Sequence, residues 1–325
     1  MWRLYFSFFA MGCLASAQDA LSGPSLGFFF DSRVQALRRI WGLPGSAIAS
    51  QTLDLGFQIG KAAFSPAQSY AFAVSTDGSV NVIWIGQDPV TAQTVTALAP
   101  APDQIAISPS GHAAAFSYGG SVKILTGLPG SLDRLEEVDI SALPSAPVAL
   151  AISDDGAVFL VSVPGNTENS YPGGVYVFSR GDSAPRLVTG SMASDLNFLA
   201  ESHDALITDE GANSVTALAD IGGTATSQWV FVDDRMAAPS VARANPDSLQ
   251  IVIGSAKDNA VALLNRNGGD AVFIPCACVP NRINPLNGSV YQLTDPDSGL
   301  IWILDLTQEP RLLFVPMPPL PGDSQ

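Results

Sequence analysis

The chain has 325 residues, of which 47% are apolar and only 14% charged, and its 30 acidic residues against 15 Lys and Arg give a net charge of −15. This balance repels phosphate groups, and the Lys/Arg patches that bind nucleic acids or anionic membranes are missing, so neither is expected as a partner. The 29 Gly and 24 Pro suit many short strands joined by tight turns rather than helical bundles or disorder.

Residues 1–17 have the pattern of an export signal. Arg3 supplies the positive charge, and the apolar run that follows it is too short to span a bilayer. Ala15-Ser16-Ala17 is a small-residue cleavage site, so residues 18–25 would be a lead-in to the mature protein. We therefore expect an exported protein, periplasmic or extracellular, without a membrane span.

A lipoprotein signal ending at Cys13 is the alternative to this cleavage site. Gly12 before the cysteine fits such a signal, but Ala10 is a poor substitute for the usual Leu, and the apolar core would be very short. We favour cleavage after Ala17 over lipid attachment at Cys13.

Two further cysteines, Cys276 and Cys278, form a C-x-C pair. An oxidising compartment favours a disulfide between them. Residues i and i+2 of a flat strand lie about 7 Å apart, at the limit of disulfide reach, so the bond requires a local bend, which Pro275 and Pro280 would suit. We expect a structural disulfide; free thiols, or a redox or metal role, are the alternatives.

A strand-ending turn recurs along the whole chain. It is centred on Ser65, Ser108, Ser153, Ala200, Asn245 and Asn284, which gives spacings of 43, 45, 47, 45 and 39 residues. The turn Gly42–Ser46 also recurs as Gly127–Ser131, 85 residues and two repeats later. A period of about 40–45 residues is that of a four-stranded propeller blade.

Each repeat offers four short strands, A to D from the inside outwards. In the clearest repeat we expect them at Gln104–Ser108, Ala113–Ser117, Ser121–Leu125 and Leu135–Ile140. These runs are rich in Val, Ile and Phe, which strands prefer, and turn dipeptides such as Asp155-Gly156 separate the strands of the repeats.

The first repeat is the weakest. Leu26–Asp31, Val34–Trp41 and Ala49–Leu55 predict strands B, C and D, which leaves little chain for strand A. Val34, Leu37 and Trp41 also fit a helical stripe, so a helix is the alternative there.

The predicted fold is therefore all-β: a seven-bladed β-propeller of four-stranded blades, with an atypical first blade. The propeller spans residues 26–316, and a Pro-rich tail follows at 317–325. An all-β chain of two domains is the alternative, but no polar or Pro-rich linker interrupts the period.

Two turns, Ile107–Gly111 and Ile152–Gly156, resemble the apolar-Ser-Pro-Asp-Gly turn of secreted bacterial seven-bladed propellers of the WD-repeat-like and YVTN types. The Trp-Asp blade ends of ordinary WD repeats are missing. These families include lactone hydrolases, scaffolds and cell-surface proteins, so the resemblance implies the fold and leaves the function open.

The expected binding face follows from topology, because the B–C and D–A connections of a propeller emerge on the same side. The longest connection is the B–C loop Pro164–Gly173, and binding residues tend to lie on loops held by a rigid scaffold. The candidate binding residues on this face are Asn166, Glu168, Asn169, Tyr171, Asp233, Asp234, Arg235, Asn281 and Arg282.

No catalytic residue, metal site or cofactor is predicted. His112 and His203 are interpreted as residues of A–B turns, and no G-x-S-x-G motif occurs. Asp295–Gly299 fails the calcium-loop template, because Gly is fifth rather than sixth and position twelve is Leu306. The arginines Arg38, Arg39 and Arg180 are interpreted as solvated strand ends.

We therefore expect a monomeric, exported binding or scaffold module whose B–C/D–A face takes an unknown protein or carbohydrate. A lactonase-like hydrolase with its site at the central channel is the alternative. Such an enzyme would gather carboxylates, Asn or His around the channel, whereas the predicted inner strands are mostly apolar or small.

Overall fold

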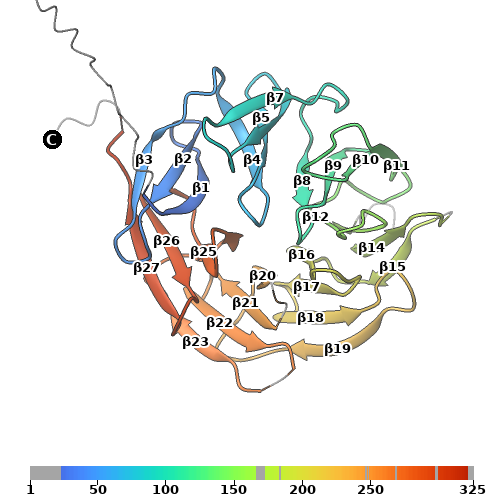
Figure 1. Ribbon diagram of the computed structural model, residues 1–325. Coiled ribbons are helices and arrows are strands. Elements are labelled where there is room, and N and C mark those ends of the chain that lie inside the picture. The colour runs from blue at the N-terminus through green and yellow to red at the C-terminus, as the bar shows by residue number, and fades with distance from the viewer. Residues whose placement is uncertain are drawn as a thin grey trace, which may run out of the picture.

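The computed structural model describes residues 23–165, 173–182, 184–245, 247, 249–267, 269–296 and 299–320. Over these residues the chain forms strands β1 to β27, in seven antiparallel sheets arranged as blades around a central axis (Figure 1). No helix that could cross a membrane is found among them. The predicted export signal and the end of the Pro-rich tail lie outside the described residues.

The blades follow one another along the chain, and each is built from consecutive strands. From the inside outwards, blade 1 holds β1 (Ser25–Asp31), β2 (Ala36–Trp41) and β3 (Ile48–Thr52); blade 2 holds β4 (Ile59–Phe64), β5 (Ala71–Ser75), β6 (Val80–Trp84) and β7 (Thr91–Thr94); blade 3 holds β8 (Gln104–Ile107), β9 (Ala113–Tyr118), β10 (Ser121–Thr126) and β11 (Leu135–Asp139); blade 4 holds β12 (Ala149–Ile152), β13 (Val158–Val163), β14 (Gly174–Ser179) and β15 (Arg186–Thr189); blade 5 holds β16 (Asp195–Phe198), β17 (Ala205–Asp209), β18 (Ser214–Ala219) and β19 (Thr226–Phe231); blade 6 holds β20 (Val241–Ala244), β21 (Gln250–Ser255), β22 (Ala260–Asn265) and β23 (Val272–Pro275); and blade 7 holds β24 (Asn284–Pro285), β25 (Val290–Gln292), β26 (Leu300–Asp305) and β27 (Arg311–Pro316).

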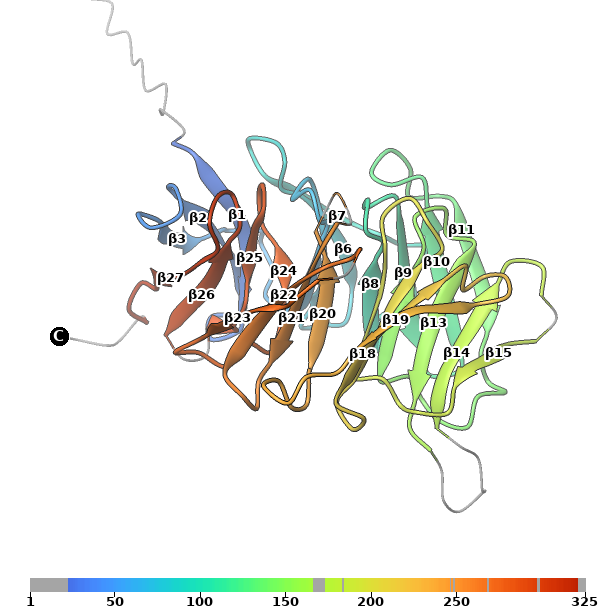
Figure 2. The ribbon, with the colours of Figure 1, turned by 90° about the horizontal axis from the view of Figure 1, so that it is seen from below.

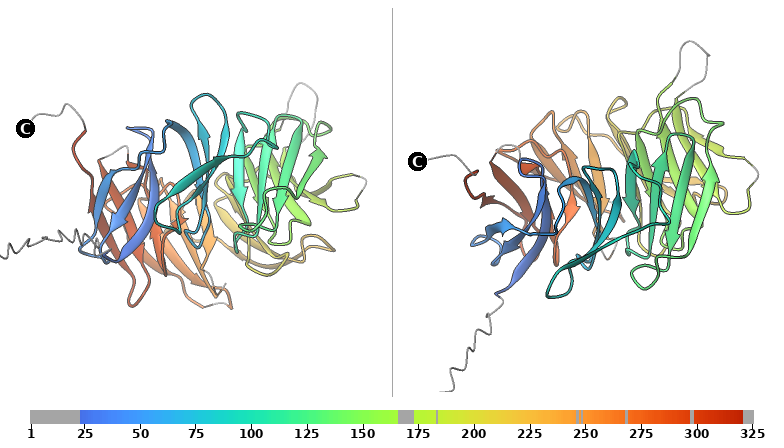
Figure 3. Two further views of the ribbon diagram at one scale, coloured as in Figure 1. Left: turned by 45° about the horizontal axis from the view of Figure 1, so that its top comes forward. Right: turned by 90° about the horizontal axis from the view of Figure 1, so that it is seen from above.

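The predicted seven-bladed propeller and its atypical first blade are thus confirmed. Blade 1 has three strands where the others have four, and its segment Ala36–Trp41 is strand β2 rather than a helix. Seen edge-on, the blades stand side by side with their strands running between two faces of the ring (Figures 2 and 3).

The recurring serine of the strand-ending turn has a structural role in three blades. The hydroxyl oxygens of Ser65, Ser108 and Ser153 each accept a hydrogen bond from the backbone N–H five residues later, at 3.0 Å. All three serines are buried. The hydroxyl therefore satisfies a donor at the start of strand B that the turn would otherwise leave unpaired, which explains why the sequence repeats it.

The buried apolar side chains of the described residues gather into seven clusters, one between each pair of neighbouring blades. A blade's two faces are therefore both covered by its neighbours. The cluster between blades 7 and 1, which closes the ring, contains Phe29 and Ile40 from one side and Ile301, Ile303 and Val315 from the other. All five are fully buried.

Ring closure depends on these side chains, because none of the strands described near the end of the chain pairs into blade 1. Gln68, in the turn after β4, takes part of the position of the missing inner strand. Its Oε1 accepts from the Phe28 N–H and its Nε2 donates to the Pro285 carbonyl, both at 2.8 Å, so one side chain links blades 1, 2 and 7. We call Gln68 and these two bonds the glutamine bridge.

The bridge also explains Gly27. This residue has a φ of +127°, and a Cβ there would come within 3.0 Å of the Gln68 carboxamide. Beside it, the Asn287 N–H donates to the Leu26 carbonyl at 2.7 Å, which pairs another group on the inner edge of β1.

Candidate functional site

The B–C and D–A connections lie on one face of the ring, which is the face predicted to bind a partner. The B–C loop of blade 4 and the D–A connection before it meet there, because the Ser145 hydroxyl donates to the Pro164 carbonyl at 2.8 Å. This face is at the bottom of Figure 2. The four candidates in the long loop (Asn166, Glu168, Asn169 and Tyr171) lie outside the described residues.

Asp233 and Arg235 form an exposed clasp in the D–A connection between blades 5 and 6. The Arg235 Nε and Nη2 donate to the two carboxylate oxygens of Asp233 at 2.9 and 2.8 Å, and the guanidinium lies 3.9 Å from the centre of the Phe273 ring. The side-chain hydrogen bond from Arg235 is the main reason that the pKa of Asp233 falls to about 2. Asp234, between them, is exposed.

Asn281 and Arg282 converge on Asp295, from the B–C connection of blade 7. The Arg282 Nη2 lies 2.8 Å from the Asp295 Oδ2, and the Asn281 amide donates to the same oxygen at 3.4 Å. Arg282 also lines the central channel. The candidates of the two D–A connections therefore do not form one site: Arg235 borders the outer groove between β19 and β22, and Arg282 borders the channel.

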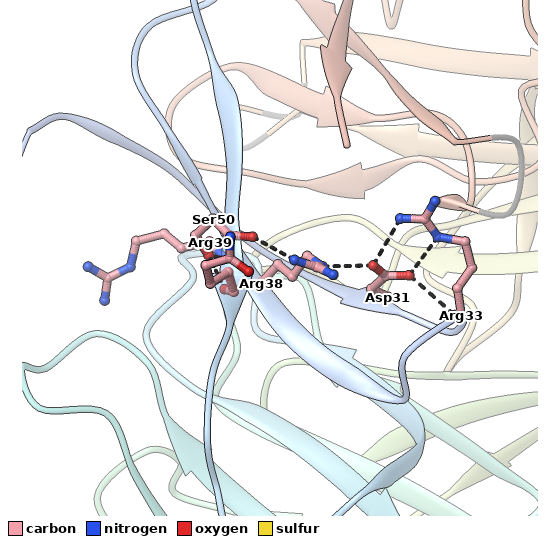
Figure 4. Close-up of polar contacts among 6 residues, drawn as sticks. Asp31, Arg33, Arg38, Arg39 and Ser50 are labelled. Carbon is pink, nitrogen blue, oxygen red and sulfur yellow. Dashed lines mark hydrogen bonds and ion pairs between the residues drawn. The ribbon is translucent and has the colours of Figure 1, made fainter. Parts of the chain in front are cut away.

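One prediction about charged residues is wrong. Arg38 and Arg39 lie inside β2 rather than at solvated strand ends, and Arg38 is only 3% exposed. The Arg38 Nε donates to the Asp31 Oδ2 at 2.7 Å and its Nη1 to the Ser50 carbonyl at 2.8 Å. In Figure 4, Arg33 and Arg38 both reach the fully buried carboxylate of Asp31, whereas Arg39 points away from it.

The same face carries a pattern that sequence reasoning missed. An exposed aliphatic side chain stands in each of the four consecutive D–A connections that precede blades 4, 5, 6 and 7, and each is between 47% and 62% exposed. We call these residues the aliphatic arc: Val148, Met192, Val232 and Val279. Their spacing of roughly one repeat was the signal available in the sequence.

The central channel holds a cavity of about 290 Å³. Its two halves differ in chemistry. Blades 2, 3 and 4 line it with small or apolar side chains only, among them Phe64, Ile107 and Ile152. Blades 5 to 7 add the polar side chains, which are Asn197, Arg243, Asn245, Arg282, Asn284 and Tyr291. Blade 1 contributes nothing to the lining, because its inner strand is missing.

Two side chains that line the cavity, Tyr291 and Arg243, have polar atoms without a hydrogen-bond partner among the described residues. The Tyr291 hydroxyl is buried and has no hydrogen-bond partner among the described residues. Burial, with a smaller contribution from the charge of Asp247, raises the pKa of Tyr291 to about 12, so the phenol stays protonated at neutral pH. Arg243 uses one nitrogen, Nη1, to bind the Asp195 carboxylate and the Ala242 carbonyl.

The two histidines lie in A–B turns, as the sequence predicted. His203 pairs its Nε2 with the Asp155 Oδ2 at 3.0 Å, which links the A–B turns of blades 4 and 5 as the turn interpretation implies. His112 is exposed in its turn. Within the described part of the chain no group of three or more His, Cys, Asp or Glu could hold a metal ion; Asp297 and Ser298 of the segment that fails the calcium-loop template lie outside it.

The predicted disulfide between Cys276 and Cys278 is present. It closes a local bend after β23, in which the two Cα atoms approach to 4.9 Å. Both cysteines are buried against Ile283 and Leu293 in the cluster between blades 6 and 7. The pair therefore stabilises the D–A connection that carries Val279 and Arg282.

The comparisons with known proteins support the fold alone. No family model matches the chain, and no curated protein matches it. A functionally unknown protein from Desulfotomaculum acetoxidans is similar in structure, with a TM-score of 0.58 and 12% identity over 90% of this chain and 99% of its own. A protein from Bacteroides fragilis described as a "putative 6-phosphogluconolactonase" has a TM-score of 0.60 and 13% identity over 90% of this chain and 94% of its own. At these identities the likeness shows the propeller fold alone.

Proposed function

We propose that the protein is an exported binding module that docks a protein partner on the B–C/D–A face of blades 4 to 7. The observation that carries the proposal is the aliphatic arc, one exposed Val or Met in each of four consecutive D–A connections. Exposed apolar surface rimmed by polar residues is typical of interaction sites, and the four side chains all belong to connections on one face of the ring.

The surroundings of the arc fit a protein interface. Two ion pairs flank it, Arg235 with Asp233 and Arg282 with Asp295. An apolar centre with a polar rim, and with Met and Arg among the contact residues, is the usual composition of such surfaces. A carbohydrate would instead be read by hydrogen-bonding side chains such as Asn166, Glu168 and Asn169, which lie outside the described residues.

Site-specific photo-crosslinking in the cells that produce the protein tests the proposal. A crosslinking residue is placed singly at Val148, Met192, Val232 or Val279. The control positions are Leu43, Ile48 and Phe314, which are equally exposed but lie in blades 1 and 7 away from the D–A connections. We expect one common adduct from at least two arc positions and none from the controls; adducts at the controls alone, or at no arc position, contradict the proposal.

The second candidate is a lactone hydrolase working in the channel. The description of the Bacteroides fragilis neighbour and the two channel arginines favour it. Hydrolysis also needs a group that activates water, ideally with a pKa near the working pH. Among the described lining residues the titratable groups are Arg243, Arg282 and Tyr291, and a phenol with a pKa of about 12 is a poor base at neutral pH. Binding is therefore the better-supported function.

A further inference from the structure

The channel is a second candidate site, separate from the aliphatic arc. Its lining is two-sided: blades 2 to 4 contribute apolar side chains, whereas most of the polar side chains come from blades 6 and 7. Blades 2 to 4 and blades 6 and 7 lie on different sides of the axis (Figure 1). A cavity with this division suits a ligand that has an apolar body and a polar group at one end. At about 290 Å³ it lies near the lower end of the volumes of small-molecule pockets.

The charge of the polar wall identifies the ligand's polar end. In a chain with 30 acidic and 15 basic residues, the charged side chains among the described residues that line the cavity are two arginines, Arg243 and Arg282. Their ion-pair partners, Asp195 and Asp295, are not part of the lining. The charged groups that face the cavity are therefore cationic, although each is paired with a carboxylate behind the lining.

Hydrogen-bonding capacity points the same way. A guanidinium has five N–H donors and no acceptor. Arg282 uses its Nη2 for Asp295, and the other guanidinium nitrogens of Arg243 and Arg282 have no partner among the described residues. The Tyr291 hydroxyl adds a buried donor that is likewise unpaired. A buried donor without an acceptor is unfavourable, and this applies to the Tyr291 hydroxyl, whereas the Arg243 and Arg282 side chains are 25% and 43% exposed and their free nitrogens can bind water. An acceptor-rich ligand would therefore pair the Tyr291 hydroxyl and replace water at the two arginines.

We propose that the central channel binds a small organic carboxylate, with the acid group at Arg243, Arg282 and Tyr291 and the apolar body against blades 2 to 4. The carboxylate oxygens accept from the free guanidinium nitrogens and from the tyrosine. Ile107 and Ile152 face the hydrocarbon part. This site does not depend on the docking of a protein partner.

A matched pair of probes tests the ligand class. 4-Phenylbutyrate and its neutral amide share one carbon skeleton and differ in the charged group alone. We expect the purified mature protein to bind the carboxylate at least tenfold more tightly than the amide by titration calorimetry. Equal affinities, or no binding of either compound at millimolar concentration, would overturn the proposal.

Two variants and one control test whether the carboxylate binds in the channel. Tyr291→Phe removes one hydroxyl and keeps the ring in its cluster, so it should fold normally and weaken carboxylate binding several-fold. Arg282→Met should abolish the preference for the carboxylate. The control Arg180→Met removes an exposed arginine paired with Glu136 on the outer side of the ring and should bind as the wild type does. Wild-type affinity in both Tyr291→Phe and Arg282→Met would refute the site. Because Tyr291 lies outside the aliphatic arc and its flanking ion pairs, crosslinking from the arc should stay at the wild-type level in Tyr291→Phe, whether or not the channel binds the carboxylate.

Discussion

The Asp-x-Arg clasp occurs twice in this molecule, in two different environments. In Asp31-Ser32-Arg33 and in Asp233-Asp234-Arg235 the arginine N–H and Nε donate to one carboxylate oxygen and Nη2 to the other. Asp31 is fully buried and gains Arg38 as a further partner, whereas the Arg235 side chain is 63% exposed. The same local chemistry therefore has a structural role in blade 1 and a surface role between blades 5 and 6.

Replacing Arg38 tests whether the buried ion pair in blade 1 contributes more stability than the exposed clasp of Asp233 and Arg235. Arg38→Met leaves the buried carboxylate of Asp31 with Arg33 alone, and breaking a buried ion pair in this way costs about 3–5 kcal/mol. We expect a loss of this size in the free energy of unfolding in urea. Arg235→Met is the matched control, and its midpoint should stay at the wild-type value, because exposed pairs contribute little. Equal losses in the two variants would contradict the assignment.

The pH dependence of this cluster has a definite sign. Burial raises the pKa of Asp31, but the hydrogen bonds and charges of Arg33 and Arg38 outweigh it and lower the pKa below its ordinary value. A carboxyl whose pKa is lower in the folded state contributes stability that is present above its unfolded pKa of about 4 and is lost as the pH falls further. In Arg38→Met the pKa of Asp31 in the folded state rises towards or above its unfolded value, so the part of the acid-induced stability loss that this carboxyl causes should shrink. The difference in the free energy of unfolding between pH 7 and pH 3 should therefore be smaller in the variant than in the wild type.

The sequence could place β2 but could not show that Arg38 is buried. Its partner Asp31 is seven residues away, on the facing strand, and only the hairpin register brings them together. Arg39 was misjudged for a similar reason: its guanidinium lies 4.6 Å from the ring centres of both Phe28 and Trp41, which shield it from solvent.

At the scale of the element, blade 1 shows how far a repeat pattern can be extrapolated. The spacing predicted three strands and no room for an inner one, and the structure has three. It did not predict what replaces the missing strand, because Gln68 and Pro285 are 217 residues apart. A signal did exist: Gln68 takes the place in its turn that Gly111 and Gly156 take in theirs, and like them it has a positive φ, 53°. A glutamine in a position that favours glycine indicates that its side chain is needed.

The glutamine bridge should stabilise the fold measurably. Gln68→Ala leaves the buried Phe28 N–H and Pro285 carbonyl without partners, and we expect a loss of about 2–4 kcal/mol in the free energy of unfolding. Gln68→Glu keeps the size and the acceptor but cannot donate to Pro285, so it should also be destabilised. Gln93→Ala, an exposed glutamine in β7, is the control. Wild-type stability in Gln68→Glu would show that the bond to Pro285 contributes nothing.

At the scale of the whole molecule, the propeller was predictable and the channel was not. The repeat period determines the number of blades, and alternation within each repeat determines which strand ends share a face. The channel lining joins Ile107, Arg243 and Tyr291, which meet because the ring closes and not because of any local pattern. The same holds for the aliphatic arc, whose members are ordinary loop residues until the blades are stacked side by side.

We expect the propeller to open first at the junction between blades 7 and 1, where the ring closes. Consecutive strands make up every blade, so blades 7 and 1 are joined without a shared sheet, and the fully buried Phe29 is central to their packing. Phe29→Ala removes a core aromatic side chain at a cost of about 3–5 kcal/mol. Hydrogen exchange read by mass spectrometry should then show faster exchange in β1 to β3 and β24 to β27, with blade 4 unchanged.

The control is Phe116→Ala, an equally buried phenylalanine between blades 2 and 3, which should loosen those blades instead. If both variants accelerate exchange uniformly around the ring, the propeller opens as one cooperative unit and the junction of blades 7 and 1 has no special weakness.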